Sequence, residues 1–307
     1  MIRYLIKRVI IGGVSLFFLT LITFILVHAI PGNPFDTGNV SEQILSVLEE
    51  KYGMDQPLGI QYIKYMEALV KGDLGMSMKK PGVAVNDLIE RGMKITGRIG
   101  GMAFLVSVIL GSLIGIWQLV TKRSGVRMIL RGIQSVGIGV PNFVYALLLM
   151  TFFGVYLRWF PVAGLTGAAN YVLPVISLAI LPVSTIARMV YGAARKEETQ
   201  EYIVFLEAKG FGRMSILCRH MWRPILAQVL VCLGQVLVSL LTGCFVVESI
   251  FTIPGLGREF VNAISNRDYT VVMGLTVFMG TTVITTQIVL DVMQMCLDPR
   301  MRYGLDE

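Results

Sequence analysis

The sequence predicts an all-α, polytopic membrane protein with six transmembrane helices. Its 307 residues are 54% hydrophobic and only 15% charged, whereas soluble domains carry about 25% charged residues. The mean hydropathy is +0.69, and the apolar residues come in long blocks. This composition excludes a disordered chain, which needs low hydrophobicity and high charge, and it argues against a soluble globular domain.

Six apolar segments are long enough to cross a bilayer. A transmembrane helix needs about 20 mainly apolar residues. Pro141 interrupts the third segment, and Pro174 and Pro182 lie in the fourth. Prolines are tolerated in such helices because neighbouring helices satisfy the freed backbone groups. The expected spans are roughly 9–30, 99–120, 133–157, 171–191, 225–250 and 271–296.

The first segment has the position of a secretory signal, and Val27-His28-Ala29 has the form of a cleavage site. Its apolar stretch is longer than the roughly 7–15 residues of a signal h-region. We therefore expect an uncleaved first helix.

The distribution of Lys and Arg predicts the orientation. These residues gather at the N-terminus, after the second and fourth spans and in the tail, whereas the opposite short loops hold only Arg158, Arg258 and Arg267. Cytoplasmic loops carry the excess of Lys and Arg, so we expect both termini in the cytoplasm. This topology explains the net charge of +7, and no nucleic-acid partner is expected.

The outer segment 31–98 contains two amphipathic stretches. Ser41–Glu50 predicts a short helix with Ser41 as its N-cap, and Ile60–Val70 predicts another after Pro57. We expect a small helical extracytoplasmic cap, with a mobile loop as the alternative.

The sequence holds no catalytic or metal-binding motif. It has no GxxxxGK[ST] phosphate loop, no GxSxG elbow and no HExxH helix. Two histidines and four scattered cysteines predict neither a metal site nor a disulfide framework. Ionisable residues within the spans, which usually mark function, are sparse. The notable ones are His28, Glu248 and Asp291, and we expect His28 and Glu248 near the membrane interface. No catalytic residue, metal or cofactor is expected. If the chain moves a solute uphill, a partner must supply the energy.

The cytoplasmic loop 192–224 contains a predicted amphipathic helix. Tyr202, Phe205 and Leu206 fall at positions i, i+3 and i+4 and form one apolar face, and Gly210 suits a C-terminal cap. Such a helix either lies on the membrane surface or inserts into the groove of a partner, and the periodicity alone leaves both open. Glutamates at its start complement the helix dipole, as does a lysine in its last turn. The glutamates are Glu197, Glu198 and Glu201, and the lysine is Lys209.

A second short helix is expected in this loop, from about Arg213 to Trp222. Pro224 then suits the first turn of the fifth span, where its missing N–H costs nothing.

Motifs along nearly the whole chain resemble one family of membrane proteins. They are IRYLIKRVIIGG with FILVHAIPGNP, KYGMDQPLGIQYIKYMEALVKGDLGMSM, VPNFVYALLLM with FPVAG, YIVFLEAKGFGRMSILCRHMWRPIL, ESIFTIPGLGREFVNAISNRDYTVVMG and LDPRMRYG. Together, and in this order, they resemble the permease subunits of binding-protein-dependent ABC importers, in the dipeptide/oligopeptide/nickel branch. The resemblance is to the permease with the large outer segment after its first helix.

This resemblance implies a type I ABC importer permease fold and a mechanism. In the family, a second homologous permease completes the path, two cytoplasmic ATPases bind ATP, and an extracytoplasmic binding protein delivers the substrate. The ATPases receive a coupling helix, which the resemblance assigns here to about 198–209. Di- and oligopeptides are the implied substrates, with nickel or a metal chelate as the alternative. The implied coupling residues are Glu198, Glu201, Tyr202, Phe205, Leu206, Ala208, Lys209 and Gly210.

The chain departs from the family pattern at one point of this loop. Val204, Phe205 and Leu206 stand where the generic loop has Glu-Ala-Ala, and the branch usually keeps a small residue at the position of Leu206. The bulk of Leu206 bears on the fit to the ATPase and not on docking itself.

The stretch 249–268 is expected to be re-entrant and to help gate the path on its outer side. Pro254-Gly255-Leu256-Gly257 predicts a turn that breaks the fifth helix just after Glu248, and irregular backbone at membrane depth is tolerated where it lines a cavity. A surface hairpin is the alternative.

Two other classes of membrane protein fit less well. A secondary transporter needs intramembrane charges, and an intramembrane protease needs a nucleophile–base pair or twin aspartates at membrane depth. The predicted layout is therefore an N-terminus and first helix at 1–30, an outer segment at 31–98, a permease core at 99–296 and a cytoplasmic tail at 297–307.

Overall fold

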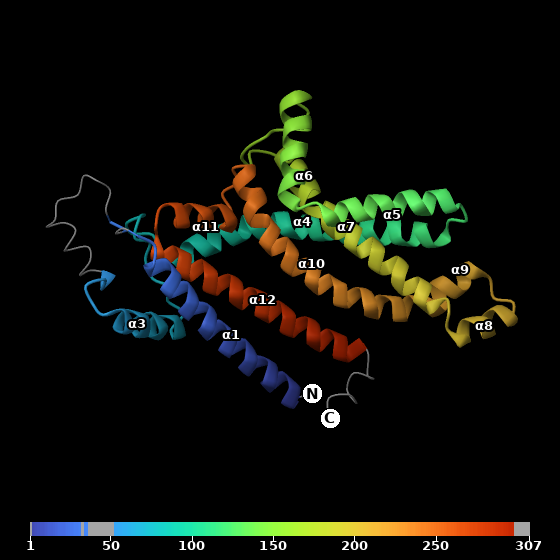
Figure 1. Cartoon of the computed structure of the whole chain (residues 1–307), viewed down its shortest axis with the longest axis horizontal. Coiled ribbons are helices and arrows are strands. Elements are labelled where there is room, and N and C mark those ends of the chain that lie inside the picture. The colour runs from blue at the N-terminus through green and yellow to red at the C-terminus, as the bar shows by residue number, and fades with distance from the viewer. Residues whose placement is uncertain (1, 32–33, 36–51, 298–307) are drawn as a thin grey trace. The chain divides into compact units, whose positions relative to one another are not determined.

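The computed structural model describes residues 2–31, 34–35 and 52–297. Within these residues the chain is helical, and its only extended pairing is an isolated bridge between Met76 and Ala84. This confirms the all-α class (Figure 1). The helix expected at Ser41–Glu50 and the tail after 297 lie outside the described residues. The chain divides into two compact units: one holds 97–253 with the chain from 286 on, and the other holds 2–96 with 254–285.

Hydropathy locates most of the spans correctly. Among the described residues, five helical stretches are long and apolar enough to cross a membrane, and a sixth span arises if a bent helix pair counts as one. The second span begins at Val85 rather than at 99, because its first turns carry charged residues that a hydropathy pattern passes over. The five stretches are Leu5–His28, Val85–Val120, Ala169–Glu197, Arg213–Ile250 and Tyr269–Met293.

The expected third span is two helices that meet at 102°. They are α5 (Ser124–Gly139) and α6 (Asn142–Leu149), and α6 continues as the π-helix η1 (Met150–Tyr156). Val140 between them is extended, with φ −104° and ψ 129°, because the ring of Pro141 excludes the α conformation from the preceding residue. Pro141 therefore turns the chain sharply where a single interrupted span was expected.

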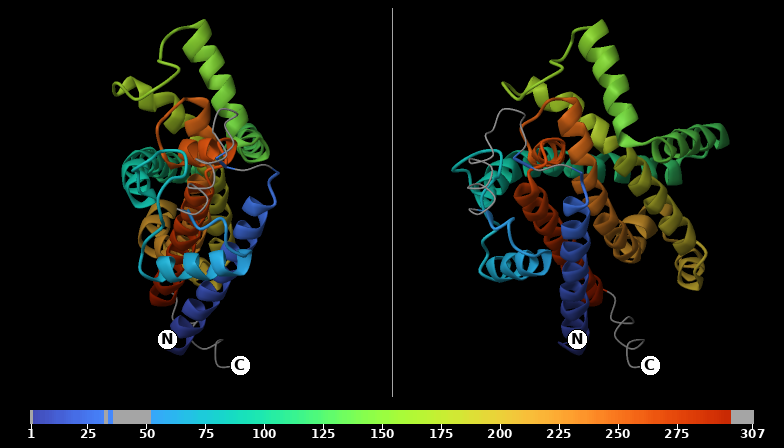
Figure 2. Two further views of the ribbon diagram at one scale, coloured as in Figure 1. Left: turned by 90° about the vertical axis from the view of Figure 1, so that its left-hand side faces the viewer. Right: turned by 60° about the vertical axis from the view of Figure 1, so that its left-hand side comes forward.

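The unit that contains the first helix is built on α1 (Ile2–His28) and the start of α12 (Tyr269–Leu297). The two helices lie side by side (Figure 2). A Cβ placed on Gly12 would lie 2.7 Å from Ile284 Cγ2, and one on Gly280 would lie 2.5 Å from Leu19 Cδ2. Glycine at both contacts lets the helix backbones approach closely, as in membrane helix pairs generally.

The expected outer helix is present as α3 (Leu58–Val70), which Pro57 caps. It lies against α1, since the hydroxyls of Thr20 and Tyr62 are 2.9 Å apart. α11 (Leu256–Ser265) and the first turns of α4 (Val85–Val120) complete this unit.

The other unit is built around α7 (Ala169–Glu197), which packs against α5, α6 and α10 (Trp222–Ile250). The glycines at 111 and 115 of α4 bring that helix against Ile186 and Val190 of α7. The buried Gln134 amide of α5 donates to Gln118 Oε1 of α4 at 2.9 Å. α7 is thus the core helix of this unit.

The fifth span is longer than expected. The short helix expected at 213–222 is present as α9 (Arg213–Ile216) and the π-helix η2 (Leu217–Met221), but it leads directly into α10. Pro224 lies in the first turn of α10, as expected. Proline has no N–H, so Pro224 cannot donate to the carbonyl of His220 four residues earlier. His220 lies in the π-helical turn η2.

Candidate functional site: the α7–α10 loop

The predicted coupling helix is present as α8 (Glu201–Ala208), between α7 and α9. It starts at Glu201 rather than at 198, because Glu198 caps the end of α7 and Gln200 is extended. The C-terminal end matches the prediction. Gly210 has φ +82°, its N–H bonds Glu207 O at 2.9 Å, and the next amide bonds Leu206 O at 3.2 Å. This is the Schellman arrangement, which favours glycine.

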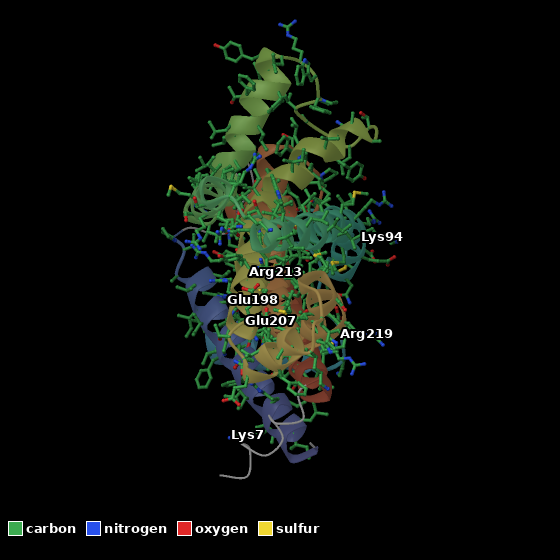
Figure 3. The ribbon with its side chains drawn as sticks, turned by 90° about the vertical axis from the view of Figure 1, so that its right-hand side faces the viewer. Lys7, Lys94, Glu198, Glu207, Arg213 and Arg219 are labelled. Atoms are coloured by element: carbon green, nitrogen blue, oxygen red, sulfur yellow. The ribbon has the colours of Figure 1, made fainter. Side chains whose placement is uncertain are left out.

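Glu198 ties the helices of the loop together (Figure 3). Its Oε2 accepts from Arg195 Nη1 and its Oε1 from Arg213 Nη2, both at 2.7 Å. Arg213 also donates to Leu119 O at 3.4 Å. The carboxylate therefore links the end of α7 to the start of α9, and it does not lie in the first turn of α8.

Tyr202 holds the start of α8 to the end of α7. Its hydroxyl donates to Glu197 Oε1 at 2.7 Å. Burial raises the pKa of Tyr202 above its usual value, and the hydrogen bond to the Glu197 carboxylate raises this pKa further. The phenol is thereby kept protonated as a donor.

The inner face of α8 packs on an apolar cluster. Ile203 is 3% exposed and belongs to a buried group with residues of α4, α7, α9 and η2, and Leu206 packs against the same group. We call this group, which consists of Leu119, Ala194, Ile203, Ile216 and Met221, the α8 cluster.

Leu206 packs toward the α8 cluster. The i, i+3, i+4 pattern assigned Tyr202, Phe205 and Leu206 to one face, but Ile203 is buried and Leu206 is half-buried against the cluster, while Val204 and Phe205 are exposed. The pattern misled because α8 is apolar on nearly all sides. The effect of the bulk of Leu206 on the fit to a partner stays a prediction.

The outer face of α8 and the turn after it form an exposed apolar patch. Lys209 Nζ lies 4.4 Å from the centroid of the Phe205 ring, which adds a cation–π contact. Glu207, Ala208 and Gly210 are also exposed around it. We call the four large apolar residues at this surface the α8 patch: Val204, Phe205, Phe211 and Met214, which are 62%, 58%, 41% and 56% exposed.

The predicted gate residues fall in two different places. Glu248 lies in α10, two residues before its end, and its side chain is fully buried within the chain. Its carbonyl accepts from Ile253 N at 2.8 Å. Phe251 and Thr252, the latter at φ +55°, make the turn that ends α10. The helix thus breaks earlier than the Pro254-Gly255 position expected.

Pro254 and Gly255 precede α11, and Gly255 is its extended N-cap. Leu256 and Gly257 lie within the helix rather than in a turn, and both are buried. Leu256 N donates to Thr96 Oγ1 at 2.9 Å. A Cβ on Gly92 would lie 2.6 Å from Leu256 Cδ2, so α4 approaches this position closely.

A buried carboxylate that sequence reasoning missed anchors the start of α12. Asp268 is 3% exposed. It accepts a very short hydrogen bond from Ser77 Oγ, and bonds from Met78 N at 3.1 Å, Lys79 N at 3.3 Å and Val271 N at 3.3 Å. The sequence signal was an aspartate just before a helix, a common N-cap, but its partner Ser77 is 191 positions away.

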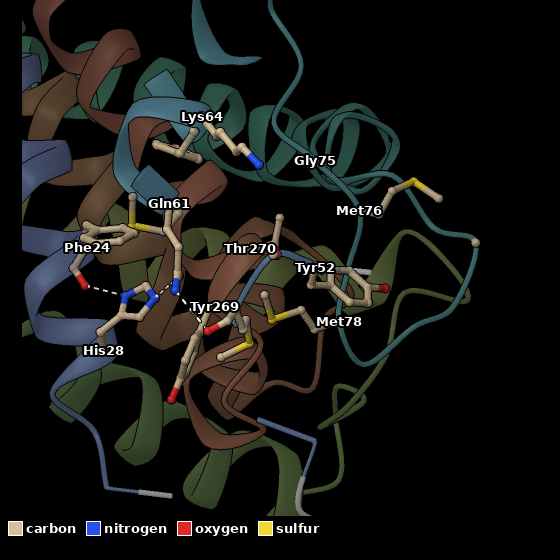
Figure 4. Close-up of a pocket in the computed structure, with 15 residues that line it drawn as sticks. Phe24, His28, Tyr52, Gln61, Lys64, Gly75, Met76, Met78, Tyr269 and Thr270 are labelled. Atoms are coloured by element: carbon tan, nitrogen blue, oxygen red, sulfur yellow. Dashed lines mark hydrogen bonds between the residues drawn. The ribbon is translucent and has the colours of Figure 1, made fainter. Parts of the chain in front are cut away.

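A cavity of about 380 Å³ lies beside this anchor in the same unit (Figure 4). His28 lies in its wall, with Nδ1 2.9 Å from Phe24 O and Nε2 3.2 Å from Gln61 Oε1. Its ring stacks on those of Phe24 and Tyr269, at 4.1 and 5.3 Å between centroids. These contacts explain His28 as a structural residue of the wall.

Comparison with known proteins identifies the family. Residues 107–303 match the family model described as the inner membrane component of binding-protein-dependent transport systems, and residues 1–82 match its N-terminal component. The solved MetNI methionine ABC transporter, in an inward-facing form, aligns with a TM-score of 0.57 and 18% identity over 69% of this chain and 96% of that one. An amino acid ABC transporter aligns with a TM-score of 0.56 and 14% identity, over 68% and 94%. These two structures support the type I importer fold.

Curated relatives match over the full length. The dipeptide transport permease DppB of Bacillus subtilis is 37% identical over 98% of both chains. The oligopeptide transport permease OppB is 35% identical in Haemophilus influenzae and 32% in Escherichia coli, over 99% of this chain and 100% of those proteins. The chain belongs to the family of inner membrane components of binding-protein-dependent transport systems.

Proposed function

We propose that this chain is a permease subunit of an ABC importer for di- and oligopeptides. A second permease completes the path, two cytoplasmic ATPases hydrolyse ATP, and an extracytoplasmic binding protein delivers the peptide. The assignment of peptide rests on full-length similarity to peptide permeases. The proposed location is the cytoplasmic membrane, with both termini inside.

The α8 patch is the observation that carries the proposed link to the ATPases. An exposed group of Val204, Phe205, Phe211 and Met214 on a firmly anchored loop is the chemistry of a helix that docks in an apolar groove. The α8 cluster behind it packs α8 against residues of α4, α7, α9 and η2, so the helix is held from its inner side. We assign Phe205 as its central contact.

We also propose that Glu248 and the 251–257 segment take part in gating on the outer side. Three features support this: a helix break at the end of α10, a strained Thr252 at φ +55°, and a short amphipathic α11 that follows. Thr252→Gly relieves the strain and is expected to change the peptide-stimulated rate of ATP hydrolysis while leaving assembly intact.

ATP-driven uptake in liposomes tests the proposal. The chain is purified with its partner permease and ATPases, the binding protein is added, and labelled dipeptide accumulation is measured. Phe205→Ala is compared with Phe152→Ala, a matched control on η1 with 56% exposure against 58% for Phe205. Losing a central aromatic contact at an interface costs about 2 kcal/mol, so F205A is expected to lower ATPase affinity about thirtyfold while F152A binds normally.

Each outcome has a distinct meaning. Uptake that needs ATP and fails in F205A supports both the permease and the docking role of α8. If peptide is not carried but a nickel chelate is, the substrate assignment is wrong. If F152A and F205A behave alike, α8 is not the docking element. Uptake without ATPases refutes the importer mechanism.

A further inference from the structure

An apolar groove lies behind the α8 cluster, within the unit built on α7. Its volume is about 340 Å³, and its lining is almost wholly apolar. The walls come from α4, α7, α9, η2 and α10, and Ser112 is the only polar side chain in the lining. Ile116, Trp222 and Leu226 are 41–44% exposed, so the groove opens to the outside of the chain. It is a lateral slot in a membrane protein rather than a closed cavity.

Two exposed arginines flank the lining residue Trp222 in the chain. Arg223 Cζ lies 5.5 Å from the centroid of the Trp222 ring, and Trp222 lines the groove. Arg219 precedes Trp222 by less than one helical turn and is exposed (Figure 3). Within the described part of the chain neither arginine forms an ion pair. Lys122 follows the end of α4 at Val120, three residues after the lining residue Leu119.

This combination has the chemistry of a phospholipid site. A tryptophan with flanking arginines is typical of the boundary between hydrocarbon and headgroups. Basic pockets between transmembrane helices near that boundary bind anionic headgroups. An apolar slot continuous with such a rim accepts an acyl chain, whereas a soluble peptide or ion has nothing to bond to along it.

We propose that this groove binds one anionic phospholipid, with an acyl chain in the slot and the phosphate at Arg219 and Arg223. The lipid then contacts Leu119, Ala194, Leu217 and Ile225, which line the groove and also belong to, or pack against, the α8 cluster. A bound chain therefore supports the inner side of α8. The binding itself does not depend on the proposed docking of α8 to an ATPase.

Native mass spectrometry of the detergent-purified chain tests this proposal. The probe is an equimolar mixture of phosphatidylglycerol and phosphatidylcholine in mixed micelles. Two arginines near the surface predict about a thirtyfold preference for one retained phosphatidylglycerol. The double variant R219Q/R223Q is expected to lose that preference and still bind either lipid. The control R158Q, at a residue predicted to lie on the opposite side of the membrane, is expected to keep the preference.

Filling the slot provides the second arm. Leu226→Trp adds bulk inside the groove, and Val231→Trp is its matched control on the same helix, equally exposed at 44% but outside the lining. L226W is expected to lose the retained lipid and V231W to keep it. Equal retention of both lipids by the native chain, or equal behaviour of L226W and V231W, overturns the proposal. A photo-cross-linker at Leu226 that captures the second permease instead of lipid also overturns it.

Discussion

Two carboxylates anchor loops in this chain, and they do so in different ways. Asp268 is almost completely buried and accepts from four donors in its own unit. Glu198 joins two arginines that are themselves more than half exposed. Hydrogen bonds to a buried charge are expensive to break because the partners are left unsatisfied, whereas exposed ion pairs contribute little. The hydrogen bonds of Asp268 are therefore expected to stay formed, whereas the ion pairs of Glu198 can break at a small cost in free energy.

Removing the buried carboxylate is expected to have the largest effect. Asp268→Ala leaves the Ser77 hydroxyl and three backbone amides without their acceptor, which costs about 3 kcal/mol or more. For a chain of this size that corresponds to a fall in Tm of about 5 °C. Thermal unfolding of the detergent-solubilised protein measures it, and Asp268→Asn, which keeps one acceptor oxygen, is expected to lose less. An unchanged Tm in D268A would refute the anchor.

Removing one of the four donors to Asp268 is expected to lower the stability by less than removing Asp268 itself. Ser77→Ala deletes the hydroxyl that donates to Asp268 and accepts from Lys80 N at 2.8 Å, and about 1–2 kcal/mol of lost stability is expected. Ser107→Ala is the matched control, because Ser107 is equally buried but its hydroxyl donates to uncharged carbonyls, Ala103 O at 2.6 Å and Ala179 O at 3.5 Å. The same unfolding assay should separate the two variants. Equal losses of stability in S77A and S107A would show that the bond to Asp268 adds nothing beyond the effect of removing a buried hydroxyl.

Opening the exposed anchor is expected to change stability by only about 0.5–1 kcal/mol. Glu198→Gln removes the charge shared by Arg195 and Arg213. Because the pairs face water, 1 M salt should abolish the difference from the native chain. Glu207→Gln, an exposed glutamate of α8, is the control. A salt-independent loss in E198Q would mean that the anchor is more deeply buried than its geometry indicates.

The smallest effect concerns pH. The pKa of Tyr202 in the folded chain is raised by burial and by Glu197. Its contribution to stability is therefore fully present below the ordinary pKa of about 10, and it is lost as pH rises through the folded value. The absorbance titration of the native chain minus that of Tyr202→Phe should reveal a phenol that ionises well above pH 10. Glu197→Gln should lower that pKa, and an unshifted titration would contradict the hydrogen bond.

Local patterns predicted the parts of the fold that depend on local chemistry. Long apolar blocks predicted the spans, Pro57 predicted the start of α3, and Gly210 predicted the end of α8. Each depends on hydropathy or on the backbone preference of one residue. These features need no knowledge of what packs against them.

Features that depend on tertiary contacts escaped prediction. Nothing local pairs Ser77 with Asp268, and nothing in an apolar octapeptide indicates that Ile203 and Leu206 face inward. Pro141 marked an interruption, but the angle of 102° follows from how α5 and α6 each pack on α7. The docking and gating residues remain predictions for the same reason, because their partners lie in other chains.

The length of α10 has a mechanical consequence. Its 29 residues make a rod of about 43 Å, longer than the roughly 30 Å of bilayer hydrocarbon. One end adjoins the α8 cluster at Trp222, and the other carries Glu248 and the strained turn at Thr252. Tilting such a rod by about 10° around its middle displaces each end by about 4 Å in opposite directions. A push applied at the Trp222 end would thereby be converted, without any intervening joint, into an opposite displacement at the Thr252 end.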